Sequence, residues 1–265
     1  MAIGSPFALV AAALTLVLAT AATAEPGLVR LEAAGTLFRA TLLDGSVKEG
    51  ADLVGMTLVF NVNEAPVRVY IAGLWPDPMD STGSVFLHDF RIADTGEPLC
   101  EPAPDGQRTG FPLTGRMAPD GRLLATDASE FELICAAGAL GKCVRFGYHP
   151  WQMEDGQTLR GHYNACVRMV RADSCGDGQG WTRDGMAIDL WDDRGIQMAE
   201  TRDDPEFSFE AGWTPDGAAC VAHTRVPGNI TLDRLKTICP RLATALACDE
   251  DVARAAGALL YNRSR

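Results

Sequence analysis

Short apolar runs separated by turn clusters occupy the chain from residue 28 to residue 135. They are rich in β-branched and aromatic residues and have the lengths of strands. The clearest runs cover residues 53–60, 67–71, 85–90 and 131–135. Pro-Asp-Gly tripeptides at 104–106 and 119–121 mark tight turns, because proline presets the first φ and glycine accepts a positive φ. No helical period interrupts this region, so we expect an all-β half built as a small sandwich or barrel.

Helical periodicity begins after Cys135. Residues 136–146 favour a short helix, although two glycines weaken it. In the next helix, apolar residues recur on one face; they are Leu159, Tyr163, Cys166, Val167 and Val170. The opposite face carries Arg160, Asn164, Arg168 and Arg171, and Thr158 is a suitable N-cap. The apolar stripe should point inward, so we expect Cys166 to be buried and disulfide-bonded.

Two hairpins and a helical tail are predicted for the remainder. Alternating residues predict one hairpin over 186–198 and another over 207–221, with the second turn at 215–217. In the tail, Leu232, Leu235 and Ile238 share a helical face behind a Thr231 cap. Pro240 ends or restarts that helix, and Asp249 caps a last turn or two carrying Val252, Ala256 and Leu259.

These patterns predict an α+β fold. Residues 25–135 are its β-rich part, and residues 136–265 are a cysteine-rich part of short helices and hairpins stapled by disulfides. We expect the two parts to pack as one compact unit.

The first 24 residues have the pattern of a signal peptide. An uncharged apolar run from Phe7 to Leu18 precedes small residues, and Ala22-Thr23-Ala24 has the form that signal peptidase cleaves. The run is shorter than the roughly 20 residues that span a bilayer. No lysine or arginine precedes Phe7, so an uncleaved anchor remains the alternative. We expect export to the periplasm or the extracellular space, with a mature chain that starts at Glu25 and has no integral membrane span.

Composition and charge narrow the class of partner. The chain has 265 residues, of which 47% are hydrophobic and 22% charged, as in an ordinary globular protein. Lysine and arginine total 23 against 35 aspartate and glutamate, so the net charge is −12. A chain this acidic has no electrostatic footprint for nucleic acid, and anionic lipid would repel it.

The cysteines fit an oxidising compartment. Their number is even, and up to four disulfides are expected, with about 105 pairings open. Zinc binding is the weaker alternative, because no Cys-x-x-Cys pair occurs. The eight cysteines are Cys100, Cys135, Cys143, Cys166, Cys175, Cys220, Cys239 and Cys248.

A dense signature lies between Gly141 and Gln197. Its segments are residues 142–148, 150–151, 162, 165–169, 171–178, 182–185 and 195–197. The signature resembles the ADYC-domain family of exported bacterial proteins, whose name-giving tetrapeptide here is Ala172-Asp173-Ser174-Cys175. Ser174 stands where the family name has tyrosine, so no role that rests on a phenol is inferred there. The resemblance implies no particular reaction, ligand or cofactor, and no catalytic residue is carried over from it.

The segment after the second predicted helix has part of the layout of a calcium loop. Asp173, Asp177 and Asp184 occupy positions one, five and twelve, with Gly178 at position six. Position three is Cys175 instead of an oxygen ligand, and a disulfide there would hold the loop in another shape. The alternative is a turn whose carboxylates accept backbone N–H groups. We therefore expect no cofactor, with calcium as the weaker hypothesis.

Two histidines and five tryptophans are the other candidates for chemistry. His149 or His162 could act as a general base beside Asp173 or Asp184, because imidazole titrates near neutral pH. No catalytic motif accompanies them, and both could be buried structural residues. Tryptophans could stack on a glycan or peptide, although most tryptophans are core residues; they are Trp75, Trp151, Trp181, Trp191 and Trp213.

Two functional hypotheses follow from these features. The first is an exported, non-enzymatic binding or structural module with a protein or glycan as its ligand. The second is a secreted hydrolase with His149 or His162 as base, and with Asp173, Asp177 or Asp184 as the orienting or metal-binding partner.

Overall fold

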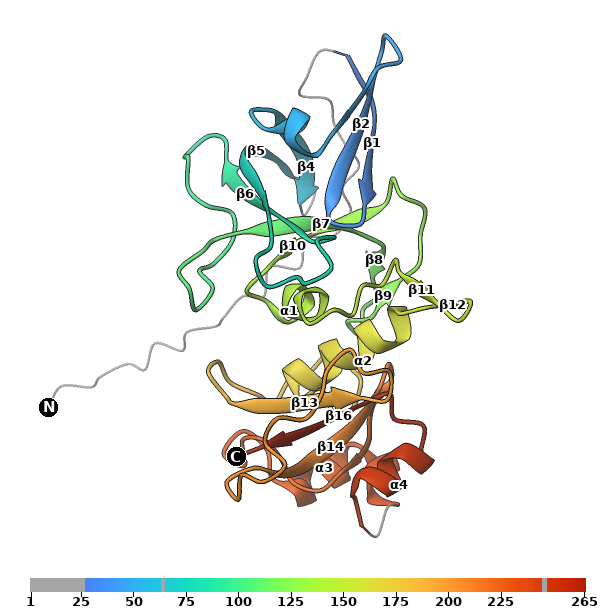
Figure 1. Cartoon of the computed structure of the whole chain (residues 1–265). Helices are drawn as coiled ribbons and strands as arrows, with labels where there is room; N and C mark the ends of the chain where they lie inside the picture. The colour runs from blue at the N-terminus through green and yellow to red at the C-terminus, as the bar shows by residue number, and fades with distance from the viewer. Residues whose placement is uncertain (1–26, 63–64, 245–246) are drawn as a thin grey trace, which may run out of the picture.

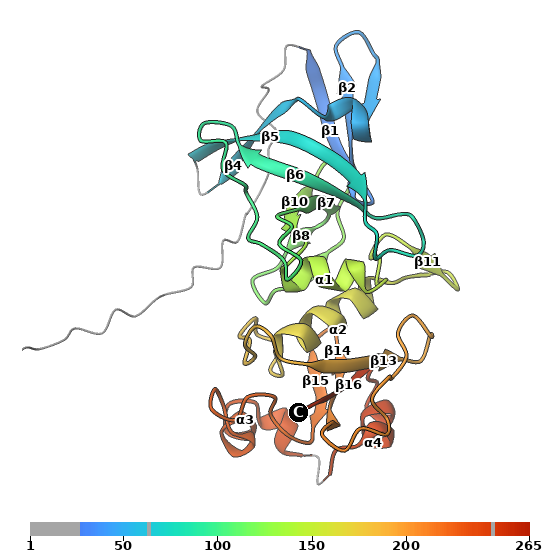
Figure 2. The ribbon, with the colours of Figure 1, turned by 60° about the vertical axis from the view of Figure 1, so that its left-hand side comes forward.

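The computed structural model describes residues 27–62, 65–244 and 247–265. The predicted leader lies outside them. The described chain forms a β-rich part and a four-stranded sheet, with the helix α2 (Arg160–Arg171) between the two (Figure 1). Figure 2 shows the same order of layers after a turn of 60°. Within the described residues, no helix combines the length and apolar composition that crossing a membrane requires.

The β-rich part has two antiparallel sheets and a small pair of strands. The strands are β1 (Leu28–Ala34), β2 (Leu37–Leu42), β3 (Val47–Glu49), β4 (Thr57–Val62), β5 (Ala65–Pro76), β6 (Phe86–Ile92), β7 (Gly110–Thr114), β8 (Arg116–Met117), β9 (Leu123–Leu124) and β10 (Phe131–Cys135). One sheet has the order β1-β2-β3, the other has the order β10-β7-β6-β5-β4, and β8 pairs with β9. The predicted strand at 53–60 begins later, because residues Gly50–Leu53 form the 3₁₀ helix η1.

An apolar core fills the space between the two larger sheets. Phe38 of β2, Phe60 of β4 and Phe131 of β10 are almost fully buried. The ring of Phe131 meets those of Phe38 and Phe60 edge to face, with centroid distances of 5.5 and 6.3 Å. This geometry is favoured because the positive edge of one ring faces the negative face of another. The β-rich half that the apolar runs predict is therefore confirmed.

Two helices follow the β-rich part, as the periodicity predicts. They are α1 (Ala139–Arg145) and α2 (Arg160–Arg171). The N-cap of α2 is Leu159, so the prediction of a Thr158 cap is wrong. Thr158 instead belongs to β12 (Gln157–Thr158), which pairs with β11 (Met153–Glu154).

Both faces of α2 are buried. Cys166 lies on the apolar stripe and is fully buried, as predicted. On the opposite face, which the pattern alone would leave to solvent, Asn164 is 8% exposed and Arg168 1% exposed. The difference arises because α2 contacts β14, β15 and β16 as well as α1.

The four-stranded antiparallel sheet has the order β13-β16-β14-β15. Its strands are β13 (Ile188–Asp192), β14 (Ser208–Thr214), β15 (Gly217–Val221) and β16 (Leu260–Ser264). The predicted hairpin over 207–221 is confirmed as β14 and β15. The predicted hairpin over 186–198 is wrong, because β13 pairs with the C-terminal strand β16.

Asp192 explains why the chain does not return as a strand after β13. Its Oδ1 accepts the backbone N–H groups of Arg194 and Ile196 at 2.8 and 3.3 Å, and its Oδ2 accepts that of Gln197 at 2.9 Å. A carboxylate that accepts several backbone N–H groups stabilises a turn in place of a ladder of strand hydrogen bonds. The carboxylate therefore ends the strand in a loop.

The helical tail begins where its caps predict. Thr231 accepts the Arg234 N–H at the start of α3 (Leu232–Ile238), and Asp249 accepts the Val252 N–H at the start of α4 (Glu250–Ala255). Between them, Pro240 opens the 3₁₀ helix η2 (Pro240–Ala243). The last helix does not extend to Leu259, because the chain turns at Gly257 and enters β16. Figure 1 shows α4 on the face of the sheet opposite α2.

One apolar core joins the two parts of the molecule. It includes Leu87 and Phe111 of the β-rich part, Tyr163 of α2, and Trp213 and Leu260 of the four-stranded sheet. All eight cysteines are paired, so the predicted disulfides are confirmed. The bonds are Cys100–Cys135, Cys143–Cys166, Cys175–Cys239 and Cys220–Cys248.

Candidate functional site

The signature tetrapeptide forms the turn that ends α2. Ala172 has φ of 51°, in the left-handed region where glycine is usual, and its N–H bonds to the Met169 carbonyl. The Asp173 N–H bonds to the Arg168 carbonyl at 2.9 Å. This turn reverses the chain and brings the Asp173 side chain back under the last turn of the helix.

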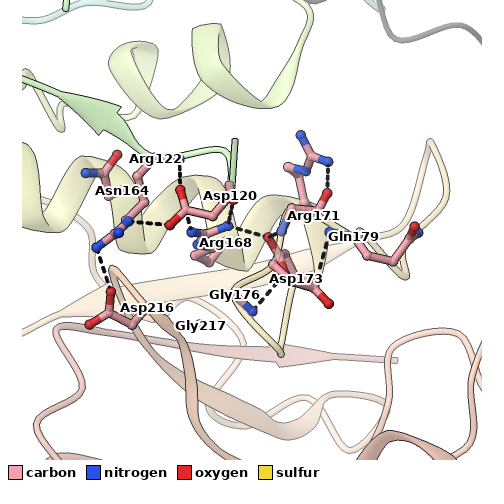
Figure 3. Close-up of polar contacts among 12 residues, drawn as sticks. Asp120, Arg122, Asn164, Arg168, Arg171, Asp173, Gly176, Gln179, Asp216 and Gly217 are labelled. Atoms are coloured by element: carbon pink, nitrogen blue, oxygen red, sulfur yellow. Dashed lines mark hydrogen bonds and ion pairs between the residues drawn. The ribbon is translucent and has the colours of Figure 1, made fainter. Parts of the chain in front are cut away.

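Asp173 is fully buried, and internal groups use both of its carboxylate oxygens (Figure 3). Its Oδ2 lies 2.5 Å from Arg168 Nη1 and accepts the Gly178 N–H at 3.0 Å. Its Oδ1 accepts the Gly176 N–H at 2.9 Å. The carboxylate therefore neutralises one arginine and organises the following loop, which leaves it no exposed oxygen for a substrate.

Arg168 connects three segments that are distant in the sequence. Besides Asp173, it donates to the carbonyls of Pro215 and Asp120. The two carbonyls belong to the turns at residues 119–121 and 215–217. Arg122 links these two turns as well, because it donates to the carboxylates of Asp120 at 2.8 Å and Asp216 at 2.9 Å (Figure 3). Two turns that the sequence marks by Pro-Asp-Gly thus meet at the end of α2.

Ser174 is also buried, and Cys175 is partly buried. The Ser174 carbonyl accepts from the Ala218 N–H and from Arg241, and Cys175 is bonded to Cys239. Gly176 follows with φ of 75°, and a Cβ there would lie 1.9 Å from the Asp216 carbonyl oxygen. Only glycine fits at that position, because the two turns pack backbone against backbone.

The structure does not gather the three calcium candidates around one point. The carboxylate of Asp173 is bonded to Arg168 and to two backbone N–H groups, and the exposed Asp177 accepts the N–H of Gln179 at 2.9 Å. Asp184 is exposed and lines a separate cavity. Over the part of the chain that the structure describes, no group of three or more His, Cys, Asp or Glu side chains could hold a metal ion.

His149 is buried among aromatic and hydroxyl groups. It is 2% exposed, its ring is parallel to that of Trp151 at a centroid distance of 5.0 Å, and Nδ1 lies 3.4 Å from Ser84 Oγ. Burial lowers its pKa, and the charge of Asp80 opposes the shift. Its burial therefore disfavours the charged form of an imidazole that is enclosed by its neighbours.

His162 is also buried, on α2 at 7% exposure, and stacks on Tyr148. Burial lowers its pKa, with a further lowering from Arg194. The hydroxyl of Tyr148 donates to Asp192 at 2.7 Å. In the described residues, neither candidate histidine forms an ion pair with Asp173, Asp177 or Asp184.

The tryptophans differ in exposure. Trp213 is fully buried and donates to Asn262 at 2.8 Å, and Trp191 is 4% exposed and packs on Tyr261. Trp151 stacks on His149, and Trp181 is half-buried. Trp75 is 37% exposed and is the tryptophan whose ring solvent reaches most readily.

A buried ion pair that the sequence analysis missed lies next to the signature. Arg225 forms two hydrogen bonds with Glu210, at 2.9 and 3.0 Å, and donates to the carbonyls of Met169 and Val170 at the end of α2. Asn262 of β16 donates to the same carboxylate at 2.8 Å. The available signal was Glu210 itself, a carboxylate within an alternating strand, but the alternation places it on the face expected to meet solvent.

A cavity of about 330 Å³ opens beside this ion pair. Its wall is formed by α1 and the residues before it, by the last residues of α2, and by residues 182–188. Four basic side chains line it together with one carboxylate, that of Asp184; the basic residues are Lys142, Arg171, Arg183 and Arg225. Sequence reasoning did not find this group, because its members come from segments that only the fold brings together.

A comparison with protein families matches residues 50–227 to the ADYC domain. Searches of curated proteins and of solved structures found no match. The family match covers well over half of the chain and includes the tetrapeptide, the Glu210–Arg225 pair and every residue that lines the cavity. It ends before α3, α4 and β16, so β16, one of the two inner strands of the four-stranded sheet, lies outside the match. The chain therefore belongs to the ADYC domain family.

Proposed function

We propose that this chain is an exported protein of the periplasm or the extracellular space, where it serves as a non-catalytic ligand-binding module. The observation that carries the proposal is the complete pairing of its eight cysteines. Four disulfides are rare in a reducing cytosol and common in proteins that fold after export. The leader pattern of residues 1–24 supports the same compartment.

The closed state of the signature supports the non-catalytic part. A general base needs a side chain that reaches the proton it abstracts. Asp173 is fully buried against Arg168 and two backbone N–H groups, and the candidate histidines are enclosed. The signature therefore serves to hold the end of α2 against the turns that surround it.

Export can be tested with the leader itself. Residues 1–24 are fused to an alkaline phosphatase that lacks its own leader and is active only after export, and a fusion without these residues is the control. We expect phosphatase activity only with the leader. Equal activity of the two fusions, or none in either, contradicts the compartment.

The thiol state tests the same proposal on the full chain. We expect maleimide to label no cysteine of the denatured, unreduced protein and eight after reduction, as counted by mass spectrometry. Two or more labelled thiols before reduction contradict the proposal.

The hydrolase alternative has a separate test. The protein is assayed with chromogenic esters, phosphate esters and peptides, beside His149→Gln and His162→Gln. We expect the same background rate from all three proteins. A rate above background that either variant abolishes, with the fold intact by circular dichroism, would establish the hydrolase instead.

A further inference from the structure

The cavity beside α1 has the size of a small-molecule site. Its volume of about 330 Å³ lies at the lower end of the range typical of such sites. The disulfide Cys143–Cys166 joins α1 to α2, and the Glu210–Arg225 pair holds the end of α2. A wall held by covalent and charge-assisted bonds is preorganised, which reduces the entropy lost on binding.

The charges of the cavity are not balanced from within the protein. Arg225 is neutralised by Glu210, but Lys142, Arg171 and Arg183 form no ion pair with a carboxylate of the described residues. Against these three cations stands one lining carboxylate, Asp184. An uncompensated positive cluster in a chain of net charge −12 attracts a compact anion locally, while the rest of the surface repels a large polyanion.

Apolar side chains line another part of the wall. Phe146 lies at the end of α1, Val170 near the end of α2, and Ile188 at the start of β13. A site of this kind takes its binding energy from apolar contact and its orientation from a few polar groups.

We infer that this cavity binds a small organic anion, with its acidic group at Lys142, Arg171 and Arg183 and its apolar part against Phe146, Val170 and Ile188. The inference rests on the proposed binding function and names its ligand class. Guanidinium groups recognise carboxylates and phosphates alike, because both present two oxygens to the planar fork. The shared chemistry is an acidic group on an apolar body.

Fluorescence titration with 8-anilinonaphthalene-1-sulfonate tests the inference, since this probe joins a sulfonate to aromatic rings. The neutral N-phenyl-1-naphthylamine is the matched probe without the charge. We expect saturable binding of one sulfonate probe per chain, weakened by added salt, and at least about tenfold weaker binding of the neutral probe. No saturable binding, or equal affinity for the two probes, overturns the inference.

Variants locate the binding in the cavity. Lys142→Met and Arg183→Met should each weaken the sulfonate probe about tenfold, the loss expected for one charge-assisted contact. Arg171 is left unchanged because it also donates to the Gly178 carbonyl. Arg234→Met is the control, an exposed cation of α3 outside the cavity. If the two cavity variants bind like the control, the site is elsewhere and the inference is wrong.

Two further measurements separate the possible outcomes. Near-ultraviolet circular dichroism of each variant excludes probe binding to a loosened fold. Competition with 3-phenylpropionate and with phenyl phosphate shows which acidic group the cavity prefers, and failure of both to displace the probe contradicts the inference. The export and thiol assays are independent of these titrations, so the ligand class and the compartment can fail separately.

Discussion

At the scale of single residues, charge is buried beside the signature in matched pairs. Arg168 and Asp173 are 2% and 0% exposed in their side chains, and Arg225 and Glu210 are 1% and 3% exposed. The attraction within a buried pair is offset by the desolvation of both ions, so such pairs contribute more to specificity than to net stability. Their geometry defines where the two turns and the end of α2 meet.

Removing one member of a buried pair should lower the free energy of unfolding by more than the intact pair contributes to it. We expect Arg168→Met to lower the free energy of unfolding by about 3–5 kcal/mol, because Asp173 is left buried and unpaired. Urea unfolding measures the loss. The control Arg122→Met removes a cation whose side chain is 38% exposed, and it should cost less than about 1 kcal/mol. Adding Asp173→Asn to Arg168→Met should recover part of the loss, and no recovery would contradict a charge-based cause.

His88 gives the fold a pH dependence. It is 1% exposed against Phe38 and Phe90, and burial lowers its pKa to about 4 from 6.5. Because the unfolded chain takes up the proton more readily, stability is complete above pH 6.5 and falls as the pH decreases toward 4. We expect this residue to account for about 3 kcal/mol of the loss.

The measurement compares urea unfolding of the protein and of His88→Leu at pH 7 and pH 4. The variant should lose less stability over this interval. A slope remains in the variant, because burial lowers the pKa of His149 and of His162 in the same direction. Equal slopes for the two proteins would show that folding does not lower the pKa of His88.

At the scale of elements, α2 is the layer on which both parts of the molecule pack. The side chain of Asn164 on this helix forms two hydrogen bonds with the backbone of Leu123 in β9. The side-chain oxygen accepts the Leu123 N–H at 2.9 Å, and the amide donates to the Leu123 carbonyl at 3.2 Å. The polar side chain of Asn164 thus forms its hydrogen bonds with a neighbouring strand instead of with water.

This contact predicts the effect of an isosteric change. Asn164→Leu should lower the free energy of unfolding by about 2 kcal/mol or more, because two buried backbone groups lose their partners. Asn229→Leu is the matched control, since its amide also donates to two carbonyls, those of Trp181 and Thr182, but at the surface. Urea unfolding should place the control within about 1 kcal/mol of the unchanged protein. Equal losses would mean that burial does not decide the effect.

At the scale of the whole molecule, the disulfides are confined to residues 100–248. In the described part of the chain, no disulfide reaches the three-stranded sheet or strands β4 and β5, which are held by backbone hydrogen bonds and apolar packing. The bond Cys175–Cys239 closes 64 residues and joins the signature turn to the end of α3, whereas Cys143–Cys166 closes 23. Cross-links over longer loops restrict the unfolded chain more strongly.

The two disulfides should therefore differ in their contribution to the free energy of unfolding. We expect the double variant Cys175→Ala with Cys239→Ala to lose about 4 kcal/mol, and Cys143→Ala with Cys166→Ala to lose about 3 kcal/mol. Urea unfolding without reductant measures both. A reversed order would indicate that local packing, and not loop length, dominates.

Local signals predicted the elements whose causes are local. Thr231 and Asp249 start helices because a side-chain oxygen accepts an N–H three residues later. The hairpin of β14 and β15 was predicted because its turn residues and alternation are contiguous. The prediction of a hairpin over 186–198 was wrong, because β13 pairs with the distant β16 and the Asp192 carboxylate holds the following residues in a loop.

Neither β16 nor the candidate cavity was predicted from the sequence, because both depend on contacts between segments that are distant along the chain. Residues 260–264 carry an asparagine, an arginine and a serine, so no alternation marks them as an inner strand of a sheet. Lys142, Arg171 and Arg183 belong to separate elements with no common motif. In each case the cause lies in segments that are distant along the chain.

By itself, the sequence determined the α+β class, the Thr231 and Asp249 caps, the involvement of all eight cysteines in disulfides and the resemblance to the ADYC family, because these depend on composition or on neighbours along the chain. Only the tertiary structure decided which cysteines bond, that both faces of α2 are buried, and that one cavity gathers three cations without an ion pair among the described residues. These features depend on which surfaces meet when apolar area is removed from water, and the spacing of residues along a chain does not specify that.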